Sequence, residues 1–323
     1  MLNQASRQTP IVVRLPNWVG DVCMSLPSLD ALAQTGHPLI ICGRPWAQDL
    51  INTHNPIEFL PMSGAFLADL KTVRALPRDL RHQSLGLILP DSLSSAALFT
   101  LSGIKSTGYR DDGRSLLLRW PCRKLDHPMH AAQKWWLLTK FALSQWNIDK
   151  HLPDLAPPAR LELTQQDLDV ATALLHKHQL DAHRAVLLAP TATGLHRGQI
   201  KVWPHFGELA RQLKAAGFVP ITCPPPNERL QAQNTCPDAM MLDPLPIRHF
   251  CGLAKLAALV ICNDSGVSHL AGAVGANQLT LFGVTNPANT RPWTDTAGLL
   301  GREGHWPSLD EVLARATAHL NSI

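Results

Sequence analysis

The stretch LVICNDSGVSH at residues 259–269 decides the fold class, because an apolar run ends there in a polar turn that contains glycine. The apolar residues predict a buried strand over 259–262, and the residues after the turn predict a helix over 267–274. The free N–H groups and the dipole at the start of such a helix attract an anion such as a pyrophosphate. Gly266 would let a phosphate approach the backbone closely.

Two side chains in this turn have two interpretations each. Asp264 accepts hydrogen bonds from ribose hydroxyls or caps the helix, and Ser265 donates to a phosphate oxygen or caps the helix. Aspartate and serine are both preferred N-cap residues, so the spacing alone leaves the choice open.

The alternation of strand and helix continues on both sides of this stretch. It predicts an α/β fold built on mainly parallel sheets with helices on both faces. The proline-rich segment at 151–160 interrupts the alternation and is typical of a linker, which predicts domains over 1–152 and 153–307. Ligands of such sheets bind beyond the carboxyl ends of the strands, so we expect the site in a cleft there. Further strands are predicted over 10–15, 39–42, 57–60, 85–89, 105–108, 185–189, 218–223 and 278–282, and helices over 65–76, 92–101, 131–146, 204–216, 247–256 and 309–320.

Composition narrows the function classes. The 323 residues carry a formal net charge of +4, which is too mild to indicate a nucleic-acid-binding protein. No run of 18 apolar residues predicts a membrane-spanning helix, and residues 1–10 lack the apolar core of a signal peptide, so a cytoplasmic protein is expected. Seven cysteines without a CxxC pair indicate reduced core residues, and no metal-ligand pattern is found. Asp167-x-Asp169 lies in a helical stretch and is expected on a solvated helix face.

Lys201 follows the predicted strand 185–189 and a loop that contains Thr191 and Thr193. Pro204 is typical of the first position of a helix, so Lys201 is expected close to a second helix N-terminus. A lysine with threonine hydroxyls at such a place suits a diphosphate, although exposed lysines without a function are common. Neither the GxxxxGK[ST] nor the GxGxxG signature occurs, so neither P-loop chemistry nor dinucleotide binding is indicated.

Asp21 follows the first predicted strand and opens a helix. It either caps that helix or faces the cleft as a carboxylate base, which a transferase needs to take a proton from an acceptor hydroxyl. Met24 stands where a capping box would have Glu or Gln, so the reciprocal cap is missing.

The segment 105–124 carries six lysines and arginines against two aspartates. Arginine binds carboxylates and phosphates well, so Arg110, Arg114 and Arg119 are candidate contacts for an anionic acceptor. Runs of charged residues commonly form surfaces that only contact solvent. The alternative is therefore that this segment is an ordinary basic loop that does not bind the acceptor.

Several motifs, in the same chain order, resemble those of the bacterial lipopolysaccharide ADP-heptose heptosyltransferases, glycosyltransferase family 9. Each motif is weak alone, but the ordered set spans most of the chain and is specific. The Asn17-Trp18 pair together with the run 263–266 resembles the inner-core heptosyltransferase II type most. The motifs are RLPNWVGDVCMSLP at 14–27, LPDS at 89–92 with 103–110, KVWPH at 201–205, NDSGVSH at 263–269, and FG at 282–283 with NP at 286–287.

The resemblance implies the GT-B architecture, in which two Rossmann-like domains face a cleft and the final helix, here 308–321, packs back on the first domain. It also implies inverting transfer of heptose from ADP-heptose to the inner core of lipopolysaccharide, an anionic lipid-linked acceptor. No metal or other cofactor is expected. Peripheral contact with the cytoplasmic face of the inner membrane is expected. Asp21 is then the base, and Asn17 and Trp18 contact the acceptor. The donor residues are then Thr191, Thr193, Lys201, Glu228, Asp264, Ser265, Gly266 and His269.

Three other functions stay open. A transferase of the same family with another nucleotide sugar or a protein acceptor would share every motif above. A binding-only relative would keep the nucleotide site without turnover, although the intact Asp21 is against it. An epimerase of similar architecture would need further acid–base residues, which the sequence does not identify.

Overall fold

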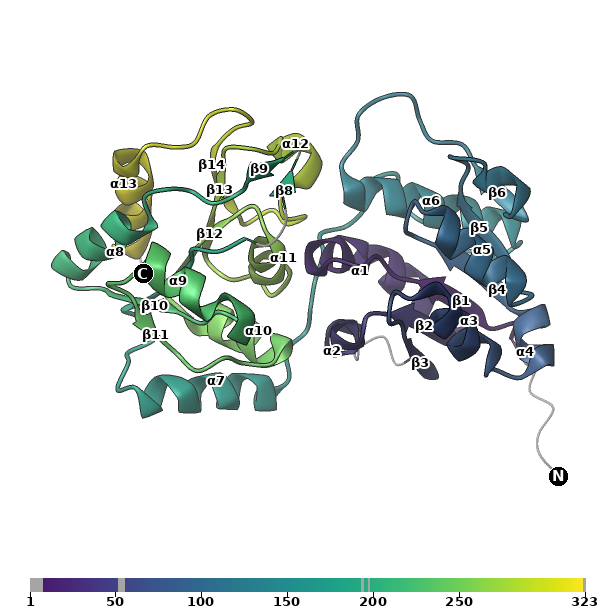
Figure 1. Ribbon diagram of the computed structural model, residues 1–323, viewed down its shortest axis with the longest axis horizontal. Helices are drawn as coiled ribbons and strands as arrows, with labels where there is room; N and C mark the ends of the chain where they lie inside the picture. The colour runs from purple at the N-terminus through teal and green to yellow at the C-terminus, as the bar shows by residue number, and fades with distance from the viewer. Residues whose placement is uncertain (1–7, 52–55, 193–194, 197, 322–323) are drawn as a thin grey trace. The chain divides into compact units, whose positions relative to one another are not determined.

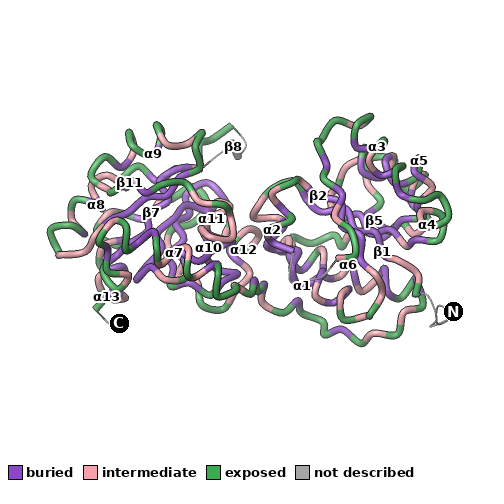
Figure 2. The backbone as a smooth tube through the Cα atoms, turned by 90° about the horizontal axis from the view of Figure 1, so that it is seen from below, coloured by how far each residue is buried: buried purple, intermediate pink, exposed green. Residues whose placement is uncertain are grey.

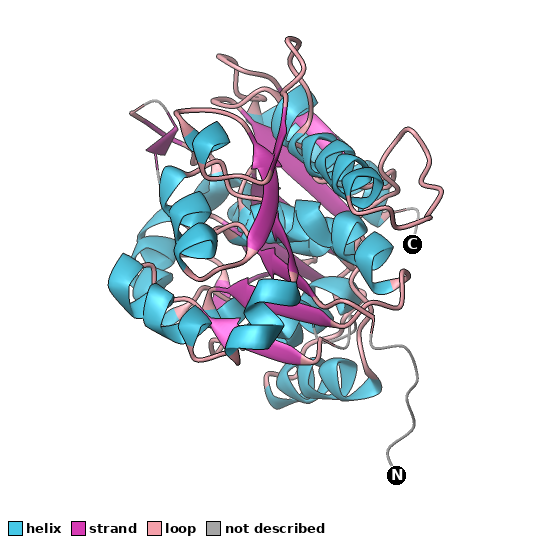
Figure 3. Cartoon of the chain, turned by 90° about the vertical axis from the view of Figure 1, so that its right-hand side faces the viewer, coloured by secondary structure: helices cyan, strands magenta, loops and turns pink. Residues whose placement is uncertain are grey.

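The chain folds into two α/β units that meet in sequence between Pro157 and Pro158 (Figure 1). The computed structural model describes residues 8–51, 56–192, 195–196 and 198–321. The division falls inside the predicted linker 151–160, a few residues after the boundary expected at 152. In each unit the strands lie between layers of helices, which confirms the α/β prediction (Figure 3).

The first unit is built on a six-stranded sheet. Its strands are β1 (Ile11–Arg14), β2 (Leu39–Gly43), β3 (Glu58–Pro61), β4 (Leu85–Ile88), β5 (Lys105–Tyr109) and β6 (Trp120–Cys122). Its helices and 3₁₀ turns are α1 (Val19–Ala33), η1 (Pro45–Ala47), α2 (Gln48–Ile51), α3 (Phe66–Arg74), α4 (Arg78–Gln83), α5 (Leu93–Leu101), η3 (Arg114–Leu116) and α6 (Ala131–Gln145). The strand order is β3-β2-β1-β4-β5-β6, and every neighbouring pair is parallel. Helices α1 and α6 cover one face, and α3 and α5 cover the other (Figure 2).

The second unit repeats this plan. Its strands are β7 (Ala185–Ala189), β8 (Leu195–His196), β9 (Gln199–Ile200), β10 (Val219–Thr222), β11 (Met240–Met241), β12 (Leu259–Asn263), β13 (Gln278–Phe282) and β14 (Gly298–Gly301). Its helices and 3₁₀ turn are α7 (Gln165–Lys177), α8 (Phe206–Ala215), η4 (Pro226–Glu228), α9 (Arg229–Thr235), α10 (Ile247–Leu256), α11 (Gly266–Ala273), α12 (Pro287–Thr290) and α13 (Leu309–Leu320). The main sheet has the order β11-β10-β7-β12-β13-β14, again wholly parallel, and β8 and β9 form a separate hairpin.

Both main sheets therefore reverse their strand order at the same place. In the first unit the reversal lies between β1 and β4, and in the second it lies between β7 and β12. Doubly wound sheets of this kind bind their ligands beyond the carboxyl ends of the strands at such a switch point. The residues that follow these four strands are consequently the first place to look for a site.

The edge strand β14 was not predicted, because its sequence GLLG lacks β-branched residues. Its pairing with β13 depends on the small size of its glycine residues rather than on strand propensity. A Cβ added to Gly298 would lie 2.5 Å from Cδ2 of Leu279, so a larger residue at this position would require the Leu279 side chain to shift.

The final helix α13 packs on the second unit, so the expectation that helix 308–321 packs back on the first domain is wrong. Its apolar residues Val312, Ala316 and Leu320 recur every fourth position and form one buried stripe. That stripe joins the core around Trp203 and Phe206.

The cysteines are buried free thiols, as expected for core residues. Burial raises the pKa of the Cys42 thiol to about 12, which keeps it protonated at neutral pH. Among the helices of the described residues, none combines the length and the apolar character needed to cross a bilayer.

Asp167 is buried, so the expectation of a solvated helix face is wrong for this residue and holds only for the exposed Asp169. The Asp167 carboxylate accepts hydrogen bonds from the backbone and side chain of Thr164, both at 2.8 Å, and completes a capping box at the start of α7. It also pairs with Arg248 of α10, whose Nη2 lies 2.6 Å from Oδ2. This ion pair locks α7 onto α10.

The Asp167–Arg248 pair predicts a pH-dependent stability. Burial opposes ionisation, but hydrogen bonds from Arg248 and Thr164 prevail and lower the pKa of Asp167 to about 2. Because the pKa is lower in the folded state, the stabilisation is complete above the unfolded pKa of about 4 and is lost as the pH falls towards 2. We expect Asp167→Asn to lower the free energy of unfolding at pH 7 by about 3 kcal/mol. The deficit should shrink by about 1 kcal/mol at pH 3.

Urea denaturation of both proteins between pH 7 and pH 3 measures this difference. Asp169→Asn, on the exposed side of the same helix, is the control and should leave stability unchanged at pH 7. A deficit of Asp167→Asn that stays constant over this pH range would contradict the assignment.

Candidate active site

The candidate donor site lies at the carboxyl ends of β7 and β12, the pair at the switch point of the second unit. Asn263 is the last residue of β12 and is fully buried. Its Oδ1 accepts a hydrogen bond from the backbone N–H of Trp203 at 2.9 Å, and its Nδ2 donates to the carbonyl of Ala189 at 3.3 Å. The Trp203 indole N–H donates to the carbonyl of Pro307 at 2.8 Å. These bonds hold the segment 201–203 on the end of the sheet.

Lys201 reaches the turn after β12, as the sequence predicts. Its Nζ donates to the backbone carbonyl of Asp264 at 3.0 Å, so an ammonium group lies close to the N-terminus of α11. The predicted position at the start of α8 is wrong in detail, because that helix begins at Phe206 and not at Pro204. A cation beside free helix N–H groups is an arrangement that suits a diphosphate.

The side chains of Asp264 and Ser265 do not cap α11. Oδ2 of Asp264 accepts hydrogen bonds from Thr285 at 2.5 Å and from Thr290 at 2.9 Å, and both threonines follow β13. Ser265 occupies the N-cap position, but its side chain makes no capping hydrogen bond. The N-cap interpretation is therefore wrong for Asp264, whereas Ser265 is the N-cap residue without a side-chain capping bond.

Two buried polar atoms in this turn lack a partner within the described part of the chain, namely Ser265 Oγ and His269 Nδ1. Nε2 of His269 lies 3.9 Å from Oδ1 of Asp264. Burial lowers the pKa of His269 to about 4, although the nearby Asp264 carboxylate opposes this shift. The imidazole is consequently neutral at pH 7 and can offer either a donor or an acceptor to a ligand.

Thr191 and Glu228 are brought together across the neighbouring strands β7 and β10. Thr191 Oγ1 donates to Glu228 Oε2 at 2.5 Å, and the threonine is buried while the glutamate is half-buried. Thr193, the second predicted threonine, lies outside the described residues. Gly266 is the first residue of α11, where the sequence predicts the closest approach of a phosphate.

The first unit places Asp21 in the first turn of α1, directly after β1. Asp21 is the third residue of this helix and is half-buried, and the N-cap is Trp18. Trp18 is 65% exposed, and the exposed Asn17 accepts a hydrogen bond from Arg14 Nη2 at 2.7 Å. Asp21 thus lies in the first turn of the helix that follows the carboxyl end of β1.

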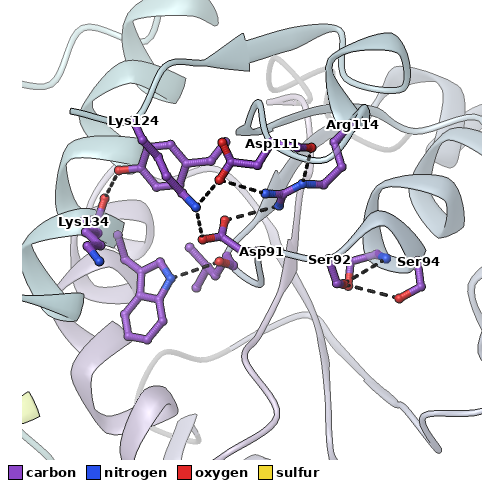
Figure 4. Close-up of polar contacts among 11 residues, drawn as sticks. Asp91, Ser92, Ser94, Asp111, Arg114, Lys124 and Lys134 are labelled. Atoms are coloured by element: carbon purple, nitrogen blue, oxygen red, sulfur yellow. Dashed lines mark hydrogen bonds and ion pairs between the residues drawn. The ribbon is translucent and has the colours of Figure 1, made fainter. Parts of the chain in front are cut away.

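Two aspartates and two cations alternate in a ring at the carboxyl ends of β4, β5 and β6 (Figure 4). Arg114 pairs with Asp91 at 3.2 Å and with Asp111 at 3.4 Å. Lys124 lies 2.7 Å from Asp91 and also pairs with Asp111. Burial alone would lower the pKa of Lys124, but hydrogen bonds to Asp111 and Asp91 raise it. The ring joins the ends of three strands in one fixed arrangement.

Arg114 is only 2% exposed, so the prediction that it contacts the acceptor is wrong. Its guanidinium is occupied by the two carboxylates of the ring. Arg110 and Arg119 are exposed and stay candidates for an anionic acceptor.

Sequence reasoning missed several residues that shape the two candidate sites. All of them stand directly after a strand, or within a few residues of one, and this position is the signal that could have found them. They are Asp91 after β4, Asp111 after β5, Lys124 after β6, Asn263 at the end of β12, and Thr285 and Thr290 after β13.

The fold is shared with solved structures of low sequence identity. The structure of Escherichia coli ADP-heptose lipopolysaccharide heptosyltransferase II matches with a TM-score of 0.76 at 22% identity, covering 97% of this chain and 99% of that one. A family 9 glycosyltransferase from Veillonella parvula matches with a TM-score of 0.78 at 16% identity, covering 98% of both chains. These likenesses show the GT-B fold.

Sequence comparison agrees with the fold. The lipooligosaccharide heptosyltransferase 2 of Haemophilus influenzae is 27% identical over 322 residues, covering 90% of this chain and 88% of the relative. The lipopolysaccharide heptosyltransferase 2 of Escherichia coli is 27% identical over 318 residues, covering 90% and 87%. The model of glycosyltransferase family 9 (heptosyltransferase) matches residues 73–315, and the chain therefore belongs to this family.

Proposed function

We propose that the protein is an inverting glycosyltransferase that moves a heptose from ADP-heptose to the inner core of lipopolysaccharide. The observation that carries the proposal is the contact of Lys201 Nζ with the Asp264 carbonyl at the start of α11, beside Ser265 Oγ, which has no partner among the residues that the structure describes. This arrangement is built for a diphosphate. The names of the curated relatives, both heptosyltransferases 2, support heptose as the sugar and lipopolysaccharide as the acceptor.

In this proposal the second unit binds the donor. The diphosphate lies at the N-terminus of α11, where Lys201, Ser265 and the backbone at Gly266 contact its oxygens. Glu228, half-buried beside Thr191, accepts hydrogen bonds from the nucleoside. The leaving diphosphate gains negative charge in the transition state, so these groups bind it more tightly there than in the ground state. We propose that they provide the charge stabilisation without a metal ion.

The first unit in this proposal binds the acceptor and supplies the base. The acceptor hydroxyl oxygen attacks the anomeric carbon of the donor sugar while the bond from that carbon to the diphosphate oxygen breaks. Asp21 takes the hydroxyl proton, and ADP leaves with the electron pair of the broken bond. A single displacement of this kind inverts the anomeric configuration. Asn17 and Trp18 lie beside Asp21 in the sequence, and Arg110 and Arg119 suit the carboxylates and phosphates of the acceptor.

The direct test is turnover with defined substrates. Purified protein with ADP-heptose and a heptose-deficient core lipid should release ADP, whereas other nucleotide sugars should not react in its place. Release of ADP only with a protein acceptor, or only from another nucleotide sugar, would favour a different transferase of the same family. Tight ADP binding without release would indicate a binding-only relative.

Lys201→Ala tests the diphosphate site. Loss of the ammonium group should weaken ADP binding by about 1.5–3 kcal/mol, the usual contribution of a hydrogen bond to a charged group. Isothermal titration calorimetry measures the change. The exposed Lys214 of α8 provides the control, and Lys214→Ala should bind ADP like the parent protein. Unchanged ADP affinity in Lys201→Ala would exclude a diphosphate role for this lysine.

Asp21→Asn tests the base. The amide keeps the shape of the side chain but cannot take a proton, so kcat should fall about 10²–10⁴-fold while ADP binding and folding change little. Asp79, a carboxylate in the first turn of α4, is the matched control for helix-dipole effects, and Asp79→Asn should retain full activity. Turnover of Asp21→Asn within a few-fold of the parent enzyme would contradict the mechanism and leave the nucleotide site intact.

A further inference from the structure

Helix α5 of the first unit has an unusual outer surface. Its sequence LSSAALFTL contains no charged residue, and its inner side places Ala96, Leu98 and Phe99 in the core. The opposite side presents Leu93 and Leu101, each 51% exposed, with the half-buried Ala97 between them at four-residue spacing, and the uncharged Ser94 and Thr100 are exposed beside this stripe. A surface helix of a globular protein normally carries polar or charged residues on its outer side. The apolar outer stripe of α5 therefore needs an explanation outside the core.

Hydrogen bonds tie the neighbouring elements α3 and η3 to α5. Arg74 of α3 donates to the carbonyl of Leu101 at 2.8 and 3.2 Å, and Thr100 of α5 donates to the carbonyl of Leu117, directly after η3, at 2.7 Å. Figure 2 shows α3 and α5 side by side on the same face of the sheet. Both neighbours add an exposed leucine, Leu67 of α3 at 78% and Leu116 of η3 at 92%. We call the exposed set Leu67, Lys71, Arg74, Leu93, Leu101 and Leu116 the leucine face.

The charges of the leucine face are all positive. Lys71 and Arg74 are exposed on α3, where with Leu67 and Leu70 they line a shallow hollow. Asp69 is the one acidic residue in the sequences of α3 and α5, and it is buried, accepting hydrogen bonds from the backbone and side chain of Ser63 at 2.7 and 2.9 Å. On α3 and α5 the exposed leucines are accompanied by cations and by no exposed anion, while Asp91 and Asp112 are exposed just before α5 and η3. Exposed leucines with cations on the same helices match a surface that is apolar below a layer of negative charge.

We propose that the leucine face binds the surface of a bilayer that contains anionic phospholipid. The leucines enter the boundary between headgroups and acyl chains, and Lys71 and Arg74 contact lipid phosphates. The contact is peripheral, because the proposal uses surface side chains only.

The position of the leucine face links it to the acceptor, a step that rests on the proposed function. Leu93 begins α5 two residues after Asp91, and Leu116 ends the turn that Arg114 begins. Asp91 and Arg114 belong to the ion-pair ring at the carboxyl edge of the sheet, where the same unit carries Asp21. A bilayer on the leucine face would therefore adjoin the edge at which a lipid-linked acceptor is proposed to bind.

Vesicle sedimentation tests the proposal with a double variant and a matched control. Vesicles of phosphatidylethanolamine and phosphatidylglycerol should sediment the parent protein, and vesicles of phosphatidylcholine alone should sediment much less. Leu101→Gln with Leu116→Gln should lower partitioning to the anionic vesicles about tenfold. The control replaces Leu125 and Leu155, which are 56% and 72% exposed in the same unit but outside the leucine face, and should bind like the parent.

A charge variant tests the second component. Lys71→Gln should lower partitioning to the anionic vesicles about fivefold, the effect of one cation near such a surface, and Lys214→Gln in the second unit should not. Equal loss in both variants would mean that net charge rather than the leucine face is responsible, which would overturn the proposal.

Two further measurements keep the outcomes distinct. All variants should release ADP at the parent rate with a core oligosaccharide freed of its lipid, so a failed vesicle assay with normal turnover overturns the leucine face and leaves the proposed function standing. Light scattering reports self-association. A parent protein that ignores vesicles but forms dimers that the Leu101→Gln, Leu116→Gln variant dissociates would assign the face to a second copy of the chain and overturn the membrane proposal.

Discussion

The buried amide of Asn263 is the constraint on which the candidate donor site depends. Its side chain accepts a hydrogen bond from the N–H of Trp203 and donates one to the carbonyl of Ala189. Because Asn263 is fully buried, water cannot replace either hydrogen bond. An aspartate there would bring a charge into an apolar core, and an alanine would leave the Trp203 N–H unpaired at a cost of about 1–3 kcal/mol. Lys201 stands two residues before Trp203 and contacts the residue after Asn263, so the position of its ammonium group follows from this amide.

The two units share one sheet topology, but the residues after their central strands differ in the sign of their charge. Each sheet reverses its strand order in the middle, and each places polar residues after the central strands β1 and β4 or β7 and β12. In the second unit that edge carries Lys201 and the N-terminus of α11, which favour an anion. In the first unit it carries the carboxylates Asp21 and Asp91, and Arg114 and Lys124 pair with Asp91. A parallel sheet fixes where a ligand binds, and the residues after each strand decide which chemistry is possible there.

Local patterns in the sequence predicted the fold well because strands and helices depend on neighbouring residues. The predicted ranges 185–189, 247–256, 278–282 and 309–320 coincide with β7, α10, β13 and α13. The predictions that failed depended on partners far along the chain. Counting charges treats Arg114 as solvated, whereas a carboxylate 23 residues away draws it into the interior. Spacing suggests that Asp264 caps its own helix, whereas a threonine 26 residues later competes for the same oxygen.

The predictions for the final helix and for Asp167 failed for the same reason. A stripe such as Val312, Ala316 and Leu320 shows that a helix has an apolar side, but it does not say which core that side covers. Likewise, the capping box at Thr164 could be read from the sequence, but its burial depends on Arg248 in another helix. Residue types and spacing identify candidate groups, while their partners are set by the tertiary fold.

Buried polar atoms without a hydrogen-bond partner among the described residues occur at the start of α11 and also elsewhere, for example at Thr107 and Gln278. The Arg114 guanidinium is buried, and its charge is matched by two carboxylates, as a rigid support requires. At the start of α11, by contrast, Ser265 Oγ and His269 Nδ1 are buried without partners among the described residues. An unpaired buried polar atom costs about 1–3 kcal/mol. A ligand rich in oxygen atoms that binds there would complete both sets of hydrogen bonds, so the same unpaired atoms that weaken the empty protein would strengthen its complex.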